Sequence, residues 1–193
     1  SASERYIFTQ LNKITRAIFP QTDDHILEYL DDDGLLVEPI YYAPIIPMVL
    51  VNGSKGIGTG FSTEIMCYNP LQIIEFLKNK LENKLNNREF IPYYEGFKGT
   101  ITPIGLTKYL FRGCYTKVAP DKIRVTELPI GYWTQDFKEY LEELQEPVDK
   151  EGKKLPALIK DYDDMSKDTT VDFTITFTKG KLEELETTMY DNN

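Results

Sequence analysis

The chain has 193 residues, of which 41% are hydrophobic and 27% are charged. This composition is typical of a globular protein with an apolar core and excludes a disordered or low-complexity chain. The longest apolar run, residues 45–51, is far shorter than the roughly 18 residues of a membrane span, and the amino end does not resemble a signal peptide. Cys67, Cys114 and the single His25 are too far apart in the sequence to form a zinc site. With only two cysteines, a reducing compartment is the simpler expectation.

The net charge of −9 argues against a protein that coats nucleic acid through bulk electrostatics. The charge is uneven, however. Residues 78–124 hold ten Lys or Arg and four Asp or Glu, a net of +6, whereas residues 127–193 hold eight and seventeen, a net of −9. One face could therefore meet a polyanion while another could not. A solvated surface of mixed charge is the simpler explanation.

The first part of the chain predicts short helices. Apolar residues recur at helical spacing over residues 7–18, which predicts an amphipathic helix that ends before Pro20. The aspartates at 23–24 resemble the cap of a second helix over residues 26–30. The carboxylates of residues 31–33 predict a solvated turn rather than a metal site, because three adjacent side chains diverge.

A glycine-rich segment follows. Residues 38–47 contain three prolines and predict an extended stretch, residues 49–51 predict a short buried strand, and residues 52–60 predict a loop with four glycines. The loop lacks the Lys-Ser/Thr ending of a P-loop, which argues against nucleotide binding. Ile57 stands between two glycines. It is either a plug that folds back into the core or an exposed wedge that enters a DNA base step.

The remaining sequence predicts a mixed domain. A helix is expected after Asn69 and Pro70, another begins near Thr134, and a third starts near residue 179. Between and after these helices, alternating apolar residues separated by turn residues predict antiparallel strands. These strands are expected around residues 100–101, 109–111, 115–118, 122–125 and 171–177.

Arg5 and Tyr6 precede the first predicted helix. A tyrosine can act as a nucleophile on phosphorus, but its ordinary pKa near 10 means that it needs a cation or metal ion to stabilise the developing charge. Arg5 could supply part of that stabilisation. Such a pair alone is more often a surface feature.

Several segments together resemble the eukaryote-type type II DNA topoisomerases. The resemblance runs over residues 4–145 in the order of the family and, more weakly, over residues 171–177. The segments that carry it are Arg5-Tyr6-Ile7-Phe8-Thr9-Gln10-Leu11, Glu38-Pro39, Pro44 to Gly53, Gly56-Ile57-Gly58-Thr59-Gly60-Phe61-Ser62, Thr126-Glu127-Leu128-Pro129 and Trp133-Thr134.

The resemblance implies roles for individual residues. Tyr6 corresponds to the tyrosine that attacks a DNA phosphodiester and forms a transient 5′-phosphotyrosyl link, and Arg5 to the arginine that contacts the scissile phosphate. Ile57 corresponds to the isoleucine that intercalates and bends the gate segment. Its neighbours are expected to contact DNA as well: Ser54, Lys55, Gly56, Gly58 and Thr59.

The same resemblance implies an α+β fold in two parts. Residues 1–47 would form the C-terminal part of a winged-helix domain that carries the active-site tyrosine. Residues 48–193 would form part of a tower domain, with an antiparallel β-meander and flanking helices.

Cofactors and partners also follow from the family. Its members bind Mg²⁺ in an acidic Toprim domain and ATP in an ATPase domain, and neither motif occurs in this sequence. We therefore expect Mg²⁺ and ATP to bind outside this chain, no metal site within it, and no cleavage by the fragment alone. The full-length enzyme is expected to act on double-stranded DNA as a homodimer without membrane association. It would work in the nucleus, or at a cytoplasmic replication site if it is viral.

Two alternatives come from other classes of protein. In a non-catalytic α+β interaction domain, Tyr6 would be structural and the acidic end would bind a basic partner. In an architectural module, Ile57 would bend DNA without any covalent step.

Overall fold

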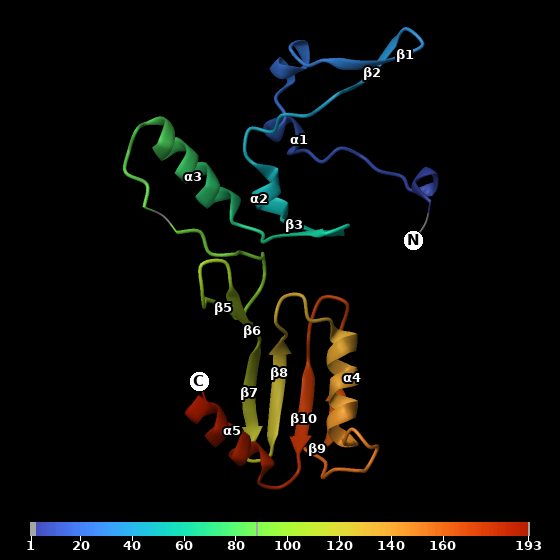
Figure 1. Cartoon of the computed structure of the whole chain (residues 1–193), viewed down its shortest axis with the longest axis vertical. Coiled ribbons are helices and arrows are strands. Elements are labelled where there is room, and N and C mark those ends of the chain that lie inside the picture. Colours follow the sequence, from blue (N-terminus) through green and yellow to red (C-terminus); the bar gives the residue numbers. More distant parts are fainter. Residues whose placement is uncertain (1–2, 88, 193) are drawn as a thin grey trace. The chain divides into compact units, whose positions relative to one another are not determined.

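The structure is a computed structural model that describes residues 3–87 and 89–192. The described residues form two compact units, one that ends at Tyr94 and one that begins at Glu95 (Figure 1). Both units combine helices with antiparallel strands, which confirms the predicted α+β class. The boundary at residues 47 and 48 stays a prediction. Arg88, part of the predicted basic stretch, lies outside the described residues.

The first unit contains short helices, two β-hairpins and one longer helix. In chain order its elements are the 3-10 helix η1 (Glu4–Tyr6), α1 (Thr15–Ile18), the 3-10 helix η2 (Gln21–His25), β1 (Tyr29–Asp32), β2 (Leu35–Pro39), α2 (Met48–Asn52), β3 (Ser54–Gly58), β4 (Phe61–Ile65) and α3 (Pro70–Leu81).

The predicted helix over residues 7–18 is largely wrong. Only Thr15–Ile18 is helical, and the segment before it runs as an extended chain (Figure 1). Phe8 and Leu11 are exposed, so they bury no apolar face. A short helix depends on burial of its apolar face for its stability, and helical spacing of apolar residues does not by itself provide that burial.

The predicted helix over residues 26–30 is also wrong, because β1 and β2 form a hairpin there. Asp33 and Gly34 turn the chain with positive φ angles of 52° and 85°. The Gly34 N–H donates to the Asp31 carboxylate at 2.6 Å, which stabilises the turn. The aspartates are exposed, so the predicted solvated turn is confirmed.

The strand predicted at residues 49–51 is instead the helix α2, and most of the predicted glycine loop is the strand β3. Pro47 stands at the start of α2, where its missing N–H costs nothing. Gly53 ends the helix with φ +65°, and a Cβ there would lie 2.5 Å from the Ile65 carbonyl oxygen. Glycine is therefore required at residue 53 by both backbone angle and space.

The helix α3 is confirmed where the sequence predicts it. The Asn69 side chain accepts a hydrogen bond from the Leu71 N–H at 2.9 Å, and Pro70 occupies the first turn. Both features favour helix initiation. Ile73 is the buried anchor of this helix.

The second unit is built on a four-stranded antiparallel sheet in the order β7-β8-β10-β9. A separate hairpin of β5 and β6 precedes it. All five predicted strands are present, and this unit contains one further strand, β9, which was not predicted. The elements are β5 (Thr100–Pro103), β6 (Tyr109–Arg112), β7 (Cys114–Ala119), β8 (Lys122–Glu127), α4 (Thr134–Gln145), β9 (Ile159–Asp164), β10 (Phe173–Phe177) and α5 (Lys181–Asn192).

The core of this unit gathers around β10. Phe173, Ile175 and Phe177 are buried and share one cluster with Leu141 of α4 and Leu182 of α5. The β10 strand pairs with β8 on one side and β9 on the other, so it lies inside the sheet. No helix within the described residues is both long and apolar enough to cross a membrane.

Candidate nucleic-acid interface

Tyr6 lies at the end of η1, where its N–H donates to the Ser3 carbonyl oxygen at 2.9 Å. The guanidinium carbon of Arg5 lies 4.9 Å from the centre of the Tyr6 ring, within the range of a cation–π contact. Tyr6 is 67% exposed. The ring is thus accessible to a large substrate and has a cation beside it.

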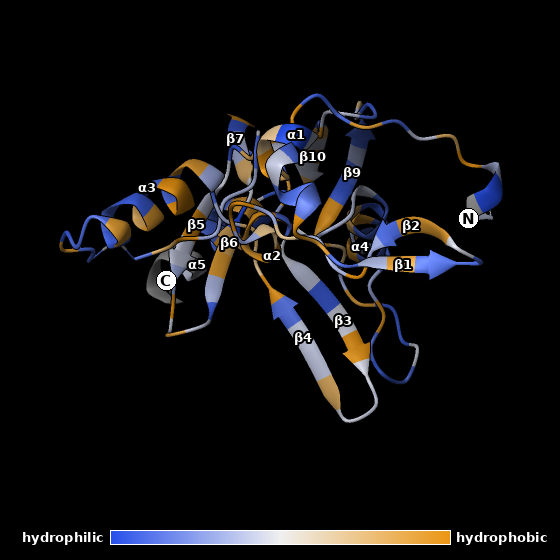
Figure 2. Ribbon diagram, turned by 90° about the horizontal axis from the view of Figure 1, so that it is seen from above, coloured by the Kyte–Doolittle hydropathy of each residue, from blue (hydrophilic) through white to orange (hydrophobic). Residues whose placement is uncertain are grey.

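Ile57 lies in the hairpin of β3 and β4, which stands out from its unit with apolar colour near its turn (Figure 2). Every residue of β3 is exposed, and Ile57 is 93% exposed. This exposure removes the core-plug alternative, because a plug would be buried. The hairpin therefore carries an apolar side chain that is accessible to a binding partner.

The hairpin has two different faces, because successive strand residues point to opposite sides. Ile57 pairs with Ser62 on one side, which we call the isoleucine face. On this face Lys55 and Glu64 form an exposed ion pair at 3.3 Å. Phe61, directly opposite Gly58, occupies the other side, which we call the phenylalanine face.

The glycines of the hairpin have different structural roles. Gly60 in the turn has φ +80°, a conformation that side chains rarely adopt. Gly56 and Gly58 have no such φ; a Cβ at Gly56 would meet nothing within 4 Å, and one at Gly58 only the Phe61 carbonyl oxygen at 3.7 Å. The fold of this chain therefore requires glycine at residue 60 but not at residues 56 and 58.

This difference predicts separate effects on hairpin stability. Gly60→Val should destabilise the hairpin by about 1–2 kcal/mol through the strained backbone, whereas Gly56→Val should not, because the strand favours β-branched residues. Amide hydrogen exchange of residues 54–65 measures this local stability. Equal loss of protection in both variants would contradict the assignment of strain to residue 60.

The structure brings together some of the predicted site residues. Arg5 and Tyr6 touch, and the hairpin segment from Ser54 to Thr59 presents its residues on one exposed element. Tyr6 and the hairpin belong to the same unit. Ser54 is exposed at the first residue of β3, and Thr59 is exposed at the start of the turn.

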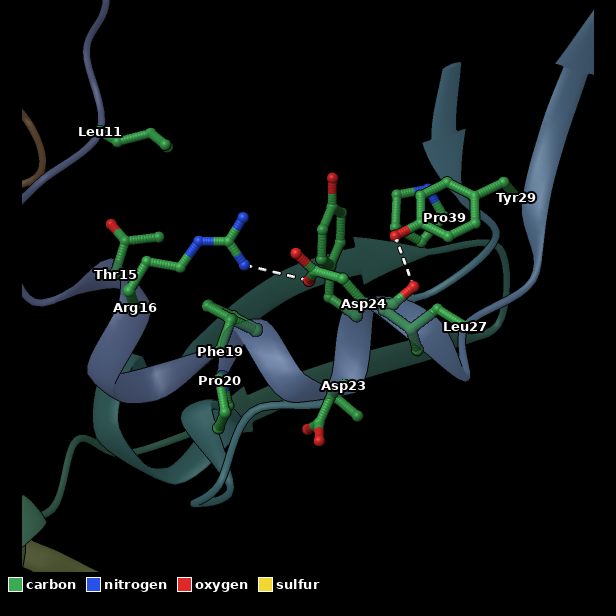
Figure 3. Close-up of a pocket in the computed structure, with 12 residues that line it drawn as sticks. Leu11, Thr15, Arg16, Phe19, Pro20, Asp23, Asp24, Leu27, Tyr29 and Pro39 are labelled. Atoms are coloured by element: carbon green, nitrogen blue, oxygen red, sulfur yellow. Dashed lines mark hydrogen bonds and ion pairs between the residues drawn. The ribbon is translucent and has the colours of Figure 1, made fainter. Parts of the chain in front are cut away.

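Sequence reasoning missed a cavity of about 410 Å³ in the first unit (Figure 3). At the wall of this cavity, Arg16 donates to the Asp24 carboxylate at 3.0 Å. The Tyr29 hydroxyl donates to the Asp24 carbonyl oxygen at 3.0 Å. The one cation among the described lining residues is therefore neutralised, so the cavity offers no free positive charge to a phosphate. Apolar and aromatic side chains form much of the remaining wall: Leu11, Phe19, Pro20, Leu27, Pro39, Tyr42 and Ala43.

The predicted basic stretch is partly neutralised as well. Arg124 donates to both oxygens of Asp172 at 2.8 and 2.6 Å, and Lys117 pairs with Glu186 at 2.8 Å. The hydrogen bonds from Arg124 hold the pKa of the Asp172 carboxyl below its usual value. This pairing therefore persists above the ordinary carboxyl pKa and is lost as the pH falls through the lowered one. At neutral pH these cations are not free for a polyanion.

The described part of the chain contains no group of three or more His, Cys, Asp or Glu side chains that could hold a metal ion. The exposed aspartates of the β1–β2 turn do not form such a group. The Asp31 carboxylate instead accepts a hydrogen bond from the Gly34 N–H within the turn. The described residues thus do not fit a Mg²⁺ site.

Comparison with known proteins gives one consistent result. The model of the DNA gyrase/topoisomerase IV A-subunit family matches residues 1–192. DNA topoisomerase 2 top-2 of Caenorhabditis elegans is 45% identical over 190 residues, which cover 96% of this chain and 12% of that protein. The mitochondrial DNA topoisomerase 2 of Dictyostelium discoideum is 44% identical over 186 residues, or 96% of this chain and 14% of that protein.

A solved structure agrees with these relatives. The crystal structure of the DNA-binding, cleavage and re-ligation domain of Plasmodium falciparum topoisomerase II aligns with a TM-score of 0.83 and 43% identity. The alignment covers 96% of this chain and 24% of the Plasmodium falciparum chain. The chain spans only 12% and 14% of the two curated relatives. Within that length, it belongs to the DNA gyrase/topoisomerase IV A-subunit family, and the resemblance of its motifs to eukaryote-type type II topoisomerases is confirmed.

Proposed function

We propose that this chain is the DNA breakage-and-rejoining region of an ATP-dependent type II DNA topoisomerase. The observation that carries the proposal is the alignment of 96% of the chain, at 43% identity and a TM-score of 0.83, with a topoisomerase II DNA-binding, cleavage and re-ligation domain. In the longer enzyme, transient double-strand breakage would allow passage of a second duplex and so control DNA topology.

Tyr6 is the proposed nucleophile. Its phenolic oxygen loses its proton and forms a bond to a DNA phosphorus, the bond from that phosphorus to the 3′-oxygen breaks, and the 3′-oxygen takes up a proton, so no net proton is gained or lost. The product is a 5′-phosphotyrosyl link, and rejoining is the reverse reaction. The exposure of Tyr6 supports this role, because a duplex can reach the ring without unfolding the unit.

Arg5 is the proposed contact to the scissile phosphate. Its guanidinium lies beside the Tyr6 ring, so a phosphate that meets the phenol also comes within reach of a bidentate cation. Charge accumulates on the phosphate oxygens in the transition state, and a fixed cation lowers that energy.

The β3–β4 hairpin is the proposed bending element. Ile57 would enter a base step from the minor groove and kink the duplex, as apolar wedges do in other DNA-bending proteins. Ser54, Lys55, Gly56, Gly58 and Thr59 would contact the DNA around the wedge. Because the fold does not require glycine at residues 56 and 58, close approach of the DNA is a physical reason for glycine there.

The remaining requirements belong to the longer enzyme. Mg²⁺ and ATP would be bound by its other domains, and its active form would be a homodimer on double-stranded DNA. Its place in the nucleus, or at a viral replication site, stays a prediction.

The isolated 193-residue chain is expected to bind duplex DNA weakly and to cleave none, with or without Mg²⁺ and ATP. Its net charge of −9 opposes binding. The binding that remains depends on contacts between free cations and phosphates, so the affinity should fall as the salt concentration rises. Fluorescence anisotropy over a salt series measures the binding, and a nicking assay measures cleavage. Nanomolar affinity at physiological salt, or any strand breakage, would contradict this expectation.

A chimera tests the proposed function itself. Residues 1–192 of this chain would replace the matching segment of the Caenorhabditis elegans enzyme, with the unmodified enzyme as control. ATP-dependent relaxation by the chimera supports the proposal. A folded chimera that bends DNA without covalent capture would favour the architectural module, and one that neither bends nor captures DNA would favour the interaction domain.

A further inference from the structure

The second unit carries an open apolar groove to which the proposed function assigns no role. The groove has a volume of about 530 Å³. Both helices of this unit contribute to its lining, with Leu144 from α4 and Leu185 from α5. Most of its other lining residues are apolar or aromatic as well, among them Phe111, Leu128 and Pro129.

The register of the sheet shows which face carries the groove. Val125 of β8 lies opposite Phe173 of β10, and Tyr115 of β7 lies opposite Val125. Since residues that pair directly point to the same side of a sheet, Tyr115 shares the face of Phe173. Leu141 of α4 and Leu182 of α5 belong to the same core cluster as Phe173. Tyr115 therefore points to the side of the sheet on which both helices pack.

Two large aromatic side chains of the groove are left open to solvent. Tyr115 lines it from β7 and is 53% exposed, and Tyr140 lines it from α4 and is 46% exposed. Contact with a partner would remove the apolar surface of these rings from water, which is favourable. Aromatic residues are also enriched among the residues that dominate protein–protein binding. The groove is therefore suited to contact another protein.

The α4 side of the groove is acidic. Asp136 and Glu143 stand four residues before and three residues after Tyr140, and these spacings place side chains on the same side of a helix. Partial burial raises the pKa of the Tyr132 phenol, and the neighbouring Tyr140 raises it further. The carboxylates of Asp136 and Glu143 act on this pKa in the same direction, so both lie within electrostatic range of Tyr132. The two carboxylates and Tyr140 thus lie near one another.

The described residues leave these two carboxylates unpaired. Neither Asp136 nor Glu143 forms an ion pair with any residue that the structure describes. Elsewhere on α4, Lys138 pairs with Asp164 of β9 at 3.3 Å. The helix therefore uses its one cation on the β9 side and keeps uncompensated negative charge beside the groove.

These charges favour a basic partner over a nucleic acid. Arg112 and Glu127, the charged residues among the described lining, bring no net charge to the groove. The helix α4 holds one Lys and four Asp or Glu, a net of −3. Such a surface repels phosphate and attracts Lys or Arg. A cation at Asp136 or Glu143 would also be close to the ring of Tyr140, which can add a cation–π contact.

The groove favours a helix as the bound segment. Its lining consists mainly of apolar side chains, so an extended segment lying on it would leave backbone N–H and C=O groups without partners. A helix satisfies its own backbone. Phe137 and Leu144 line the groove seven residues apart on α4, which corresponds to about 10 Å. Apolar residues at positions i and i+7 of a bound helix have the same separation, as in other helix-in-groove contacts.

From this geometry and charge we infer that the groove between α4 and α5 is a docking site for a basic amphipathic helix of a partner protein. The apolar side chains of that helix fill the groove, and its Lys or Arg side chains pair with Asp136 and Glu143. Every residue proposed to contact DNA belongs to the first unit, so this site lies on a different part of the chain. It does not depend on the proposed function.

The test uses the 193-residue chain and a fluorescent synthetic peptide of about 15 residues, a length at which an isolated helix is marginally stable. The peptide has Leu at positions i, i+4, i+7 and i+11 and Lys on both flanks of that stripe. Anisotropy gives its Kd. The parent chain should bind this peptide, and a peptide with Glu in place of each Lys should not bind. A peptide with a central Pro should bind at least about tenfold more weakly, because Pro breaks the helix.

Variants of the chain locate the binding. The double variant Asp136→Asn/Glu143→Gln should weaken binding roughly fivefold at low salt, as the loss of two exposed ion pairs would. Glu139→Gln/Glu183→Gln is the matched control, because it removes two carboxylates of the same helices that neither line the groove nor act on Tyr132. This control should bind within about twofold of the parent chain. Thermal unfolding checks that each variant is folded.

Tyr140→Ala tests the apolar part of the contact. It should weaken binding roughly tenfold, as the loss of an aromatic contact does at other interfaces. Leu106→Ala removes a fully exposed apolar side chain from the β5–β6 turn of the same unit and should leave the Kd unchanged.

Several results would overturn the inference. Equal losses in the two double variants would mean that the peptide senses only the overall charge. An unchanged Kd in Tyr140→Ala would place the contact outside the groove, and undiminished binding of the Pro peptide would exclude a helix. Self-association of the parent chain in analytical ultracentrifugation that the Asp136→Asn/Glu143→Gln variant loses would make a second copy the occupant. Peptide binding to the isolated chain but not to the chimera would show that the longer protein itself covers the groove.

Discussion

Tyr6→Phe in the chimera is expected to abolish DNA cleavage and relaxation while leaving folding and non-covalent DNA binding nearly unchanged. Only the phenolic oxygen is removed, and that oxygen is the proposed nucleophile. Loss of a covalent nucleophile lowers turnover by several orders of magnitude in other enzymes. Because Tyr6 is exposed, its hydroxyl is not needed for packing. Covalent complex trapped with denaturant, compared with binding by anisotropy, measures the two effects separately.

Tyr41→Phe is the matched control. Tyr41 is another exposed tyrosine of the first unit, at 59% exposure against 67% for Tyr6. This variant should retain cleavage. Wild-type amounts of covalent complex in Tyr6→Phe would exclude Tyr6 as the nucleophile, whatever the control shows.

Ile57→Ala is expected to remove most of the DNA bend and to slow cleavage, without a change in thermal stability. A buried isoleucine would cost about 2–5 kcal/mol on truncation, whereas an exposed position usually changes stability by no more than about 0.5 kcal/mol. The 93% exposure of Ile57 places it in the second class. Cleavage should fall because an unbent duplex presents its phosphate away from Tyr6, and small misplacements cost large factors in rate.

The measurement pairs thermal unfolding with the end-to-end distance of labelled DNA bound to the chimera. Ile73→Ala is a useful contrast, since Ile73 is buried in α3 and its truncation should lower stability. A large loss of stability in Ile57→Ala with an unchanged bend would show that the wedge assignment is wrong for this chain.

The strand β10 of the second unit could be predicted because its apolar and polar residues alternate strictly. In β10, Phe173, Ile175 and Phe177 are buried and the residues between them are less so, which is the pattern of a strand over one core. The strand β9 was missed because Ile159 is followed by a charged segment that includes Asp161 and Asp163. Only pairing with β10 gives that segment its structure.

The first unit was harder to predict because little of it is buried. Residues 7–14 have helical spacing but no surface to pack against, so the periodicity has no energetic consequence. The glycine segment resembles a loop because glycine weakens strands, yet pairing with Phe61–Ile65 makes it β3. The exposure of Ile57, which excludes the core plug, depends on that pairing and could not be predicted from the sequence.

The residues of the candidate site were found through motifs rather than through periodicity. Arg5 and Tyr6 are two ordinary residues until the glycine segment and the later motifs appear in family order. The two-faced hairpin was not predicted, because the register that places Gly58 opposite Phe61 is a property of the fold.

The central claim is that Tyr6 becomes covalently joined to DNA. The most direct measurement is mass spectrometry of the peptide that remains attached to DNA after the chimera is trapped during cleavage and digested with trypsin and nuclease. The proposal predicts a nucleotide phosphate on the tyrosine of the peptide spanning residues 6–13. A phosphate attached to a different tyrosine of the chimera, or trapped DNA with no modified tyrosine, would contradict it.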